Sequence, residues 1–303
     1  MLEADAGRDR AVPRRAAAVT DAPSHGSVPR LDLERARNVA LAAARAAGAI
    51  HLRYLGEIAR EGITRKSSAR DLVTRADVEA ERAIVAAIRA AFPDHAIEAE
   101  EEVRDAADGR PRWFVDPLDG TTNFVHELPA FCASIALYAD GAPQVAVVHA
   151  PRFSETFHAT RGGGAWLETA HFGAGAARRL SVSAASALSE SVVATGFPYK
   201  RNEMRAQGIE DNLGNFSRVF YEVRGLRRMG SAAIDLAYVA AGRFDAFWEL
   251  HLSPHDVAAG ALLVQEAGGE VTDVGGGAEW LRGGSIVAGP RVLCQALRPR
   301  LRR

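Results

Sequence analysis

Two aspartates stand three residues apart in the segment WFVDPLDGTTNF, residues 113–124. An apolar run precedes Asp116, so we expect a buried strand that ends at Val115 and opens Asp116 to a crevice. Asp119 follows at the turn, and we expect both carboxylates and the Leu118 carbonyl to converge on one point. Such clustered oxygens suit a hard cation, and Mg²⁺ prefers carboxylates together with a substrate phosphate.

The residues after the aspartates suit an anion. Gly120 permits an unusual backbone dihedral, and a helix starting at Thr121 and Thr122 would offer free N–H groups to a phosphate. Other interpretations compete. A plain turn uses Asp, Pro and Gly in the same way, whereas an aspartyl-phosphate phosphatase has a DxD spacing and an EF-hand needs alternating acids with a terminal Glu. The segment alone leaves the metal site and the plain turn open.

Acidic residues also cluster shortly before Asp116, at Glu98, Glu100, Glu101 and Glu102. A run of acids is usually a solvated surface, but one of these glutamates could complete a metal shell. The spacing does not choose among them.

A further candidate acid, Asp256, lies far downstream in the segment SPHD. The pattern predicts a helix with Ser253 as its N-cap, Pro254 as its first residue and Asp256 in its first turn, where an acid stabilises the helix. An Asp at that position can also project toward a ligand. The neighbouring His255 is more typical of a structural or solvated histidine than of a metal ligand.

Apolar periodicity predicts the elements that must position these acids. The predicted helices span residues 31–56, about 76–91, 203–220, 231–242 and 253–269. The predicted strands and hairpins span residues 66–77, 96–99, 113–116, 131–141, 143–151, 155–168, 191–197 and 244–250. After about residue 181 the predicted elements change to strands that are separated by helices. We therefore expect one domain over 31–180 with most metal ligands and another over 181–303 with Asp256 and the substrate contacts.

The composition is that of an ordinary globular protein, with 48% hydrophobic and 25% charged residues among 303. The formal net charge of −1 gives no global electrostatic case for nucleic-acid or membrane binding. Cys132 and Cys294 lie in apolar surroundings far apart, which predicts buried free thiols. Residues 1–30 lack periodicity, so we expect a disordered tail. We find no signal core and no run of about 18 apolar residues, and therefore expect a cytoplasmic protein.

Together these motifs resemble the inositol monophosphatase family of Mg²⁺-dependent phosphomonoesterases. DPLDGTTNF at 116–124 is similar to its first signature, DVAAGALLVQEAGG at 256–269 to its second, and Glu100-Glu101 to its Glu-Glu pair. The resemblance covers residues 33–298. VATGFP, LSPHDVAAG and SIVAGPR, starting at residues 193, 252 and 285, are most similar to the bacterial extragenic-suppressor (SuhB) branch. It implies an α+β fold, a layered α-β-α-β-α sandwich of the inositol monophosphatase and fructose-1,6-bisphosphatase type.

The resemblance also implies roles for individual residues. The metal ligands, for about two to three Mg²⁺ ions, would be Glu100, Asp116, the Leu118 carbonyl, Asp119 and Asp256, with Asp116 bridging. Thr121, with Asp77 behind it and together with Glu100, would orient and deprotonate a metal-bound water. The substrate contacts would be the Gly120 and Thr121 amides for the phosphate, Glu249 for hydroxyls, and the lining stretch Gly230, Ser231 and Ala232. Lys66 matches a mobile-loop position near the metals.

The implied reaction is hydrolysis of myo-inositol 1-phosphate to inositol and phosphate, with sensitivity to Li⁺. Fructose 1,6-bisphosphate, histidinol phosphate and 3′-phosphoadenosine 5′-phosphate are alternative substrates. A SuhB-like regulator that binds the transcription machinery through protein contacts is an alternative of another class, and the family implies a homodimer. The sequence departs from the family at His255, where tryptophan is usual, and at Ala99, where glycine is usual.

Overall fold

The computed structural model of the chain describes residues 31–57, 64–65, 72–173 and 176–303. Within them, Asp32–Arg303 form one compact unit. The predicted tail, residues 1–30, and the predicted loop residue Lys66 lie outside the described residues.

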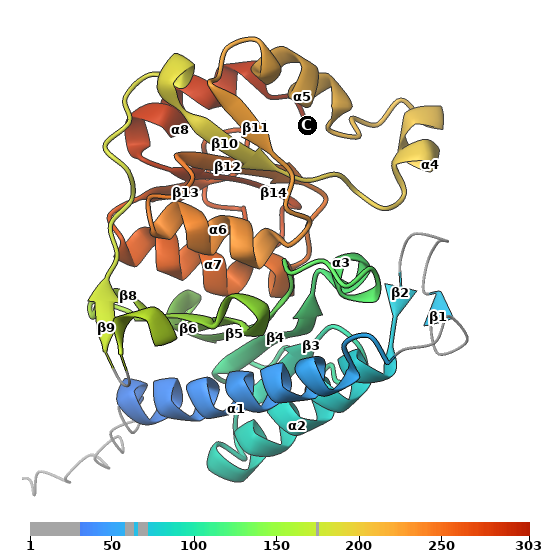
Figure 1. Cartoon of the computed structure of the whole chain (residues 1–303), viewed down its shortest axis with the longest axis vertical. Coiled ribbons are helices and arrows are strands. Elements are labelled where there is room, and N and C mark those ends of the chain that lie inside the picture. The colour runs from blue at the N-terminus through green and yellow to red at the C-terminus, as the bar shows by residue number, and fades with distance from the viewer. Residues whose placement is uncertain (1–30, 58–63, 66–71, 174–175) are drawn as a thin grey trace, which may run out of the picture. The chain divides into compact units, whose positions relative to one another are not determined.

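The compact unit is layered, with helices and sheets alternating (Figure 1). The first two layers are the helices α1 (Leu33–Tyr54) and α2 (Arg75–Ala91) and a seven-stranded sheet. Its strands lie side by side in chain order: β3 (Ala96–Ala99), β4 (Arg112–Asp119), β5 (Cys132–Ala139), β6 (Ala142–Ala150), β7 (Glu155–Thr160), β8 (Gly164–Thr169) and β9 (Ala177–Arg179). The pair β3–β4 is parallel and the other neighbours are antiparallel.

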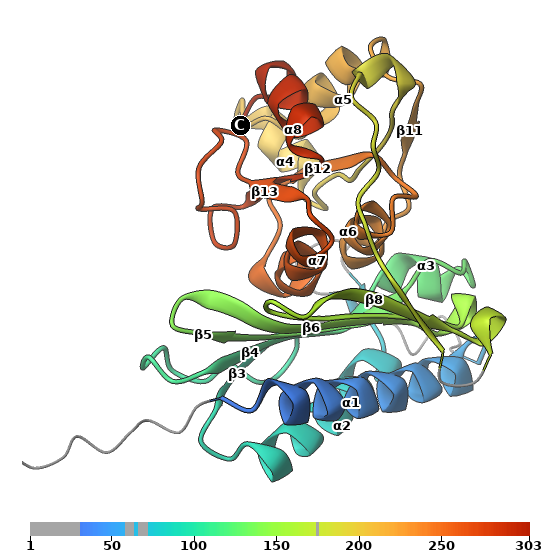
Figure 2. The ribbon, with the colours of Figure 1, turned by 90° about the vertical axis from the view of Figure 1, so that its left-hand side faces the viewer.

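Two central helices separate this sheet from a second one (Figure 2). They are α6 (Ala232–Ala240) and α7 (Pro254–Glu266), which are apolar on nearly every side because a sheet covers each face. The second sheet has the order β11 (Gly225–Arg227), β10 (Val192–Thr195), β12 (Ala246–Leu250), β14 (Ser285–Gly289) and β13 (Glu270–Thr272). Helices α5 (Leu213–Phe220) and α8 (Arg291–Leu297) cover its outer face. The predicted α+β layered fold is confirmed.

Short elements complete the described chain. They are the antiparallel pair β1 (Thr64–Arg65) and β2 (Leu72–Val73), the helices α3 (Thr121–Val125) and α4 (Arg201–Ala206), and the 3₁₀ turns Pro151–Phe153, Ala170–Phe172, Leu188–Glu190 and Arg298–Arg300. A hairpin was predicted over residues 66–77. The strand β2 lies within this range, whereas β1 lies just before it. None of the described helices is long and apolar enough to span a membrane. Cys132 and Cys294 are buried free thiols, as predicted.

Two element predictions were wrong. The helix predicted over 203–220 is broken into α4 and α5, because Gly208 and Asn212 adopt left-handed conformations with φ of 72° and 73°. The Asn212 side chain is buried and bonded to the Thr195 hydroxyl and to the Trp248 indole N–H, which fixes the break. The strand predicted to end at Val115 continues through Asp119, with a register irregularity between Asp116 and Asp119.

One apolar core joins the two sheets through the central helices. It includes Phe157 and Ala146 of the first sheet, Leu236 and Leu263 of the central helices, and Phe247 of the second sheet. The boundary predicted near residue 181 falls in the segment between β9 and β10, and the division into two domains stays a prediction.

Candidate active site

A cavity of about 420 Å³ opens where the carboxyl end of β4, the start of α6 and the start of α7 meet. Seven of the predicted site residues line it: Glu100, Asp119, Gly230, Ser231, Ala232, Glu249 and Asp256. Asp116 lies behind this wall with 2% of its surface exposed. The structure therefore brings the three distant acidic motifs of the sequence to one place.

The turn after β4 has a backbone that glycine alone fits. Gly120 has φ of +93°, and a Cβ there would lie 2.7 Å from the carbonyl oxygen of Ala130. Thr121 then begins the five-residue helix α3, as predicted. The Leu118 N–H donates to Asp116 Oδ1 at 3.0 Å, so the turn itself holds one oxygen of that carboxylate.

The Thr121 hydroxyl is held between two acceptors. Its oxygen lies 3.1 Å from Asp77 Oδ1 and 3.1 Å from the Leu118 carbonyl oxygen, and its single proton can serve one of them at a time. Asp77 is itself fixed at the start of α2, because its Oδ2 accepts from the Thr74 N–H at 2.8 Å and from the Thr74 hydroxyl at 2.6 Å. Thr121 and Asp77 thus form the predicted pair.

The acids of the cavity repel one another. Burial raises the pKa of Asp116 well above its usual value, and the charges of Glu100, Asp119 and Asp256 raise it further. Burial and the charge of Asp256 likewise raise the pKa of Asp119 to about 7. Bonds from the Ser231 hydroxyl and the Ala233 N–H, both 2.7 Å from Asp119 Oδ2, act in the opposite direction.

This repulsion is the observation that fits a cation. A divalent cation among Glu100, Asp116, Asp119 and Asp256 would offset both the burial and the mutual repulsion, and carboxylate oxygens are the ligands Mg²⁺ takes. In the described part of the chain, no group of three or more His, Cys, Asp or Glu side chains is arranged so that it could already hold a metal ion. The ligand set stays a prediction.

Asp256 has the capping role that its sequence predicts. Its Oδ2 accepts from the Ser253 N–H at 2.6 Å, Pro254 begins α7, and the same aspartate lines the cavity. His255 lines the cavity too, and its Nε2 lies 3.9 Å from Asp256 Oδ1. Structural capping and a cavity position are therefore compatible in one aspartate.

Another part of the cavity wall comes from the second sheet. Glu249, on β12, has its pKa raised to about 8 by burial and by the charge of Asp256. A Cβ at Gly196 would lie 2.2 Å from the Glu249 carboxylate oxygens, so any larger residue there would displace the Glu249 side chain. The lining residues that sequence reasoning missed include Arg104, Tyr199, Lys200, Arg228 and Asp235. Asp235 had a signal, because an acid within the apolar helix segment SAAIDLAYVAAG is unusual.

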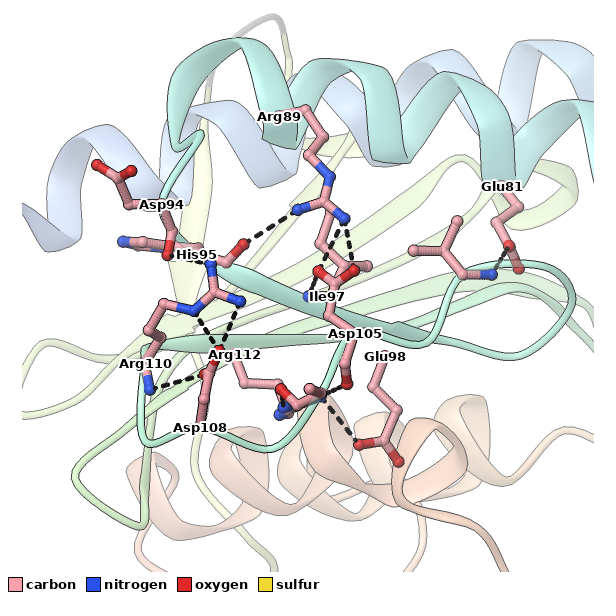
Figure 3. A network of polar contacts seen from close by, with 12 residues as sticks. Glu81, Arg89, Asp94, His95, Ile97, Glu98, Asp105, Asp108, Arg110 and Arg112 are labelled. Atoms are coloured by element: carbon pink, nitrogen blue, oxygen red, sulfur yellow. Dashed lines mark hydrogen bonds and ion pairs between the residues drawn. The ribbon is translucent and has the colours of Figure 1, made fainter.

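Sequence reasoning also missed Glu81 of α2, whose side chain points to the loop after β3 (Figure 3). Glu81 is fully buried on α2, and its carboxylate accepts from the N–H groups of Glu101, Glu102 and Val103 at 2.7, 2.7 and 3.0 Å. These bonds fix the backbone directly after Glu100. A glutamate on the buried face of α2, between Ala80 and Ile84, was the signal available.

Comparison with known proteins identifies the family of the chain over most of its length. Residues 32–302 match the model of the inositol monophosphatase family. The Nus factor SuhB of Pseudomonas aeruginosa is 45% identical, covering 86% of this chain and 93% of the relative. The inositol-1-monophosphatase of Rhizobium meliloti is 44% identical, covering 88% and 96%. The solved inositol monophosphatase from Anabaena (Nostoc) is 37% identical with a TM-score of 0.77, covering 89% and 96%.

Proposed function

The chain belongs to the inositol monophosphatase family and is a phosphatase, and from this premise we propose that it is a Mg²⁺-dependent phosphomonoesterase acting on myo-inositol 1-phosphate. The observation that carries the proposal is the group of mutually repelling acids around Asp116 and Asp119, whose pKa values are raised. The name of the Rhizobium meliloti relative supports the substrate.

The metal ligands of the proposal are Glu100, Asp116, the Leu118 carbonyl, Asp119 and Asp256, for about two to three Mg²⁺ ions. When bound, Mg²⁺ neutralises the carboxylates and the phosphate and lowers the pKa of water. Asp116, the most deeply buried of these carboxylates, would bridge two ions. The Ser231 hydroxyl and Ala233 N–H hold Asp119 Oδ2, so Asp119 Oδ1 is the oxygen proposed to face the cation.

The proton path of the proposal runs through Thr121. Its hydroxyl can accept a hydrogen bond from the attacking water while donating its own proton to Asp77 Oδ1, 3.1 Å away. Glu100, at the cavity wall, would share in orienting that water. The water oxygen attacks phosphorus and gives up one proton, the bond from phosphorus to the leaving oxygen breaks, and the leaving oxygen takes up one proton, so the number of protons is unchanged. The Gly120 and Thr121 amides would hold the phosphate in place.

The substrate preference of the proposal rests on the wall opposite the acids. Glu249 is an acceptor for substrate hydroxyls, and Gly230, Ser231 and Ala232 shape the space beside it. An ionised Glu249 would favour a neutral, hydroxyl-rich leaving group over a second phosphate beside it. Fructose 1,6-bisphosphate, histidinol phosphate and 3′-phosphoadenosine 5′-phosphate are therefore the alternative substrates to compare.

The test is a phosphate-release assay over these substrates with Mg²⁺, with a chelator, and with Mg²⁺ plus Li⁺. We expect release from myo-inositol 1-phosphate that requires Mg²⁺ and is inhibited by Li⁺. Release from none of the substrates at any Mg²⁺ concentration would overturn the proposal. Preferential release from another substrate would retain the metal site and correct the substrate.

A second candidate function is protein-mediated regulation of transcription, favoured by the relatives named Nus factor SuhB. Pull-down of transcription proteins from the source cell by the purified chain would support it. Complementation of a deletion phenotype by Asp116→Asn would assign the physiological role to binding instead of catalysis. The homodimer is to be tested by light scattering, and the cytoplasmic location stays a prediction.

A further inference from the structure

His51 lies on the buried stripe of α1. This stripe recurs every three or four residues through Ala40, Ala44 and Ala47, so position 51 is the next one directed inward. His51 replaces the small side chains of the stripe with an imidazole that has no exposed surface. Its ring packs edge-on against Phe124 and Phe131, beneath the turn that follows β4.

The tautomer of His51 follows from its one hydrogen bond. The ring Nε2 lies 2.9 Å from the carbonyl oxygen of Pro117, and a carbonyl oxygen can only accept, so Nε2 carries the proton. Nδ1 is buried and has no hydrogen-bond partner within the part of the chain that the structure describes. Burial lowers the pKa of His51 to about 3, which agrees with a neutral ring.

The bonded carbonyl belongs to a peptide unit with a second task. The same peptide plane carries the Leu118 N–H, which donates to Asp116 Oδ1 at 3.0 Å. His51 therefore bonds the carbonyl of this peptide unit, and the N–H of the same unit bonds Asp116. Rotation of the plane would break both bonds.

We propose that His51 is a positioning residue for the metal site, which fixes the Pro117–Leu118 peptide plane and thereby the orientation of the Asp116 carboxylate. His51 touches neither substrate nor metal and acts through the backbone alone. The inference rests on the metal site of the proposed function. An imidazole with an unpaired nitrogen is a costly way to fill apolar space, which is the reason to assign it a role beyond packing.

Three variants of the full chain test the proposal. His51→Gln retains a donor, because the amide nitrogen of glutamine is as many bonds from Cα as Nε2 of histidine. His51→Leu keeps apolar bulk but removes the donor, and it exchanges the unpaired Nδ1 for an unpaired Pro117 carbonyl, so stability should change little. His158→Leu is the matched control, since His158 is a buried histidine of β7, outside the cavity lining.

The measurements are Mg²⁺ binding by calorimetry and thermal unfolding of the metal-free protein. We expect His51→Leu to raise the Mg²⁺ dissociation constant about 10-fold or more. His51→Gln should restore it to within about 3-fold of wild type, and His158→Leu should leave it unchanged. Equal binding by wild type and His51→Leu would overturn the inference alone. No Mg²⁺ binding by the wild type would overturn the proposed function and this inference with it.

A nitrogen-15 spectrum of the metal-free wild type keeps the inference testable if His51→Leu does not fold. The His51 ring should show a protonated Nε2 and a bare Nδ1 at neutral pH, with the signal assigned by its loss in His51→Gln. A ring protonated on Nδ1 would overturn the inference, because Nε2 could then not donate to Pro117.

Discussion

Two groups of acidic side chains lie on or near β3 and β4, one paired with arginines and the other gathered in the cavity with Asp256 of α7. In the paired group, Asp105 accepts two bonds from Arg89 at 2.7 and 2.8 Å and one from the Ile97 N–H (Figure 3). Glu98 is paired with Arg282 at 2.7 Å. The bond from Arg89 lowers the pKa of Asp105 below its usual value.

The cavity group has the opposite electrostatics. Burial and the neighbouring carboxylates raise the pKa of Asp116 well above its usual value and that of Asp119 to about 7. The fold thus supplies arginine partners for Asp105 and Glu98, whereas burial and the neighbouring carboxylates dominate the pKa values of Asp116 and Asp119. We infer from this difference that the first group serves stability and that the second is suited to a cation from solution.

Replacing Asp116 should give the largest effect on activity. Asp116→Asn keeps the shape of the side chain but removes the charge proposed to bridge two cations. We expect phosphate release to fall by about 10²-fold or more. The metal-free protein should unfold at the same or a higher temperature, because the buried amide is neutral at every pH and needs no proton to avoid repulsion from the neighbouring carboxylates. Activity within about twofold of wild type would contradict the role of the cavity group.

Replacing Glu249 should have an intermediate effect that depends on the substrate. Glu249→Gln weakens the acceptor proposed to meet substrate hydroxyls, so KM for myo-inositol 1-phosphate should rise about 10-fold, equivalent to about 1.4 kcal/mol. KM for a glycerol phosphate, which has fewer hydroxyls, should rise less. KM for both substrates is measured from initial rates. An equal rise in KM for the two would show that Glu249 does not contact the hydroxyls of the leaving group.

Replacing Asp105 should have the smallest effect on activity. Asp105→Asn breaks the pair with Arg89, which is partly exposed, and should lower the free energy of unfolding by about 1 kcal/mol. Phosphate release should stay at the wild-type level, since Asp105 does not line the cavity. Denaturant unfolding and the phosphate assay measure the two effects. A loss of activity as large as that of Asp116→Asn would erase the distinction between the groups.

Features that depend on neighbouring residues could be predicted from the sequence, whereas features that depend on tertiary packing could not. Gly120 as a turn glycine, Thr121 as a helix start and Ser253 with Asp256 as a helix cap all follow from short-range rules, and the structure contains them. The break at Asn212 was missed because buried partners from other strands hold its left-handed backbone.

The same distinction between local sequence and tertiary packing applies to the site residues. Spacing alone could not choose Glu100 from its acidic neighbours, and the family resemblance supplied that choice. Glu81, Asp235 and His51 were missed although each is a polar residue on an apolar helix face. Which turn or carbonyl such a residue meets is decided by the packing of helix on sheet, so no local pattern contains it.

Thermal unfolding of the wild type against pH, with a chelator or with Mg²⁺, tests the central claim most directly. The folded state raises the pKa of Asp119 from 3.8 to about 7 and of Glu249 from 4.5 to about 8, so it binds more protons than the unfolded state in this range. Stability should therefore fall as pH rises through these values. Buried neutral histidines such as His51, whose pKa is lowered to about 3, act in the opposite direction only below about pH 7.

We therefore predict that the metal-free protein unfolds at a lower temperature at about pH 8.5 than at about pH 7. Mg²⁺ should stabilise it at both values and more at the higher one, where the carboxylates are ionised. An unfolding temperature that Mg²⁺ leaves unchanged at about pH 8.5 would contradict the account, because the cavity acids would then not be a cation site.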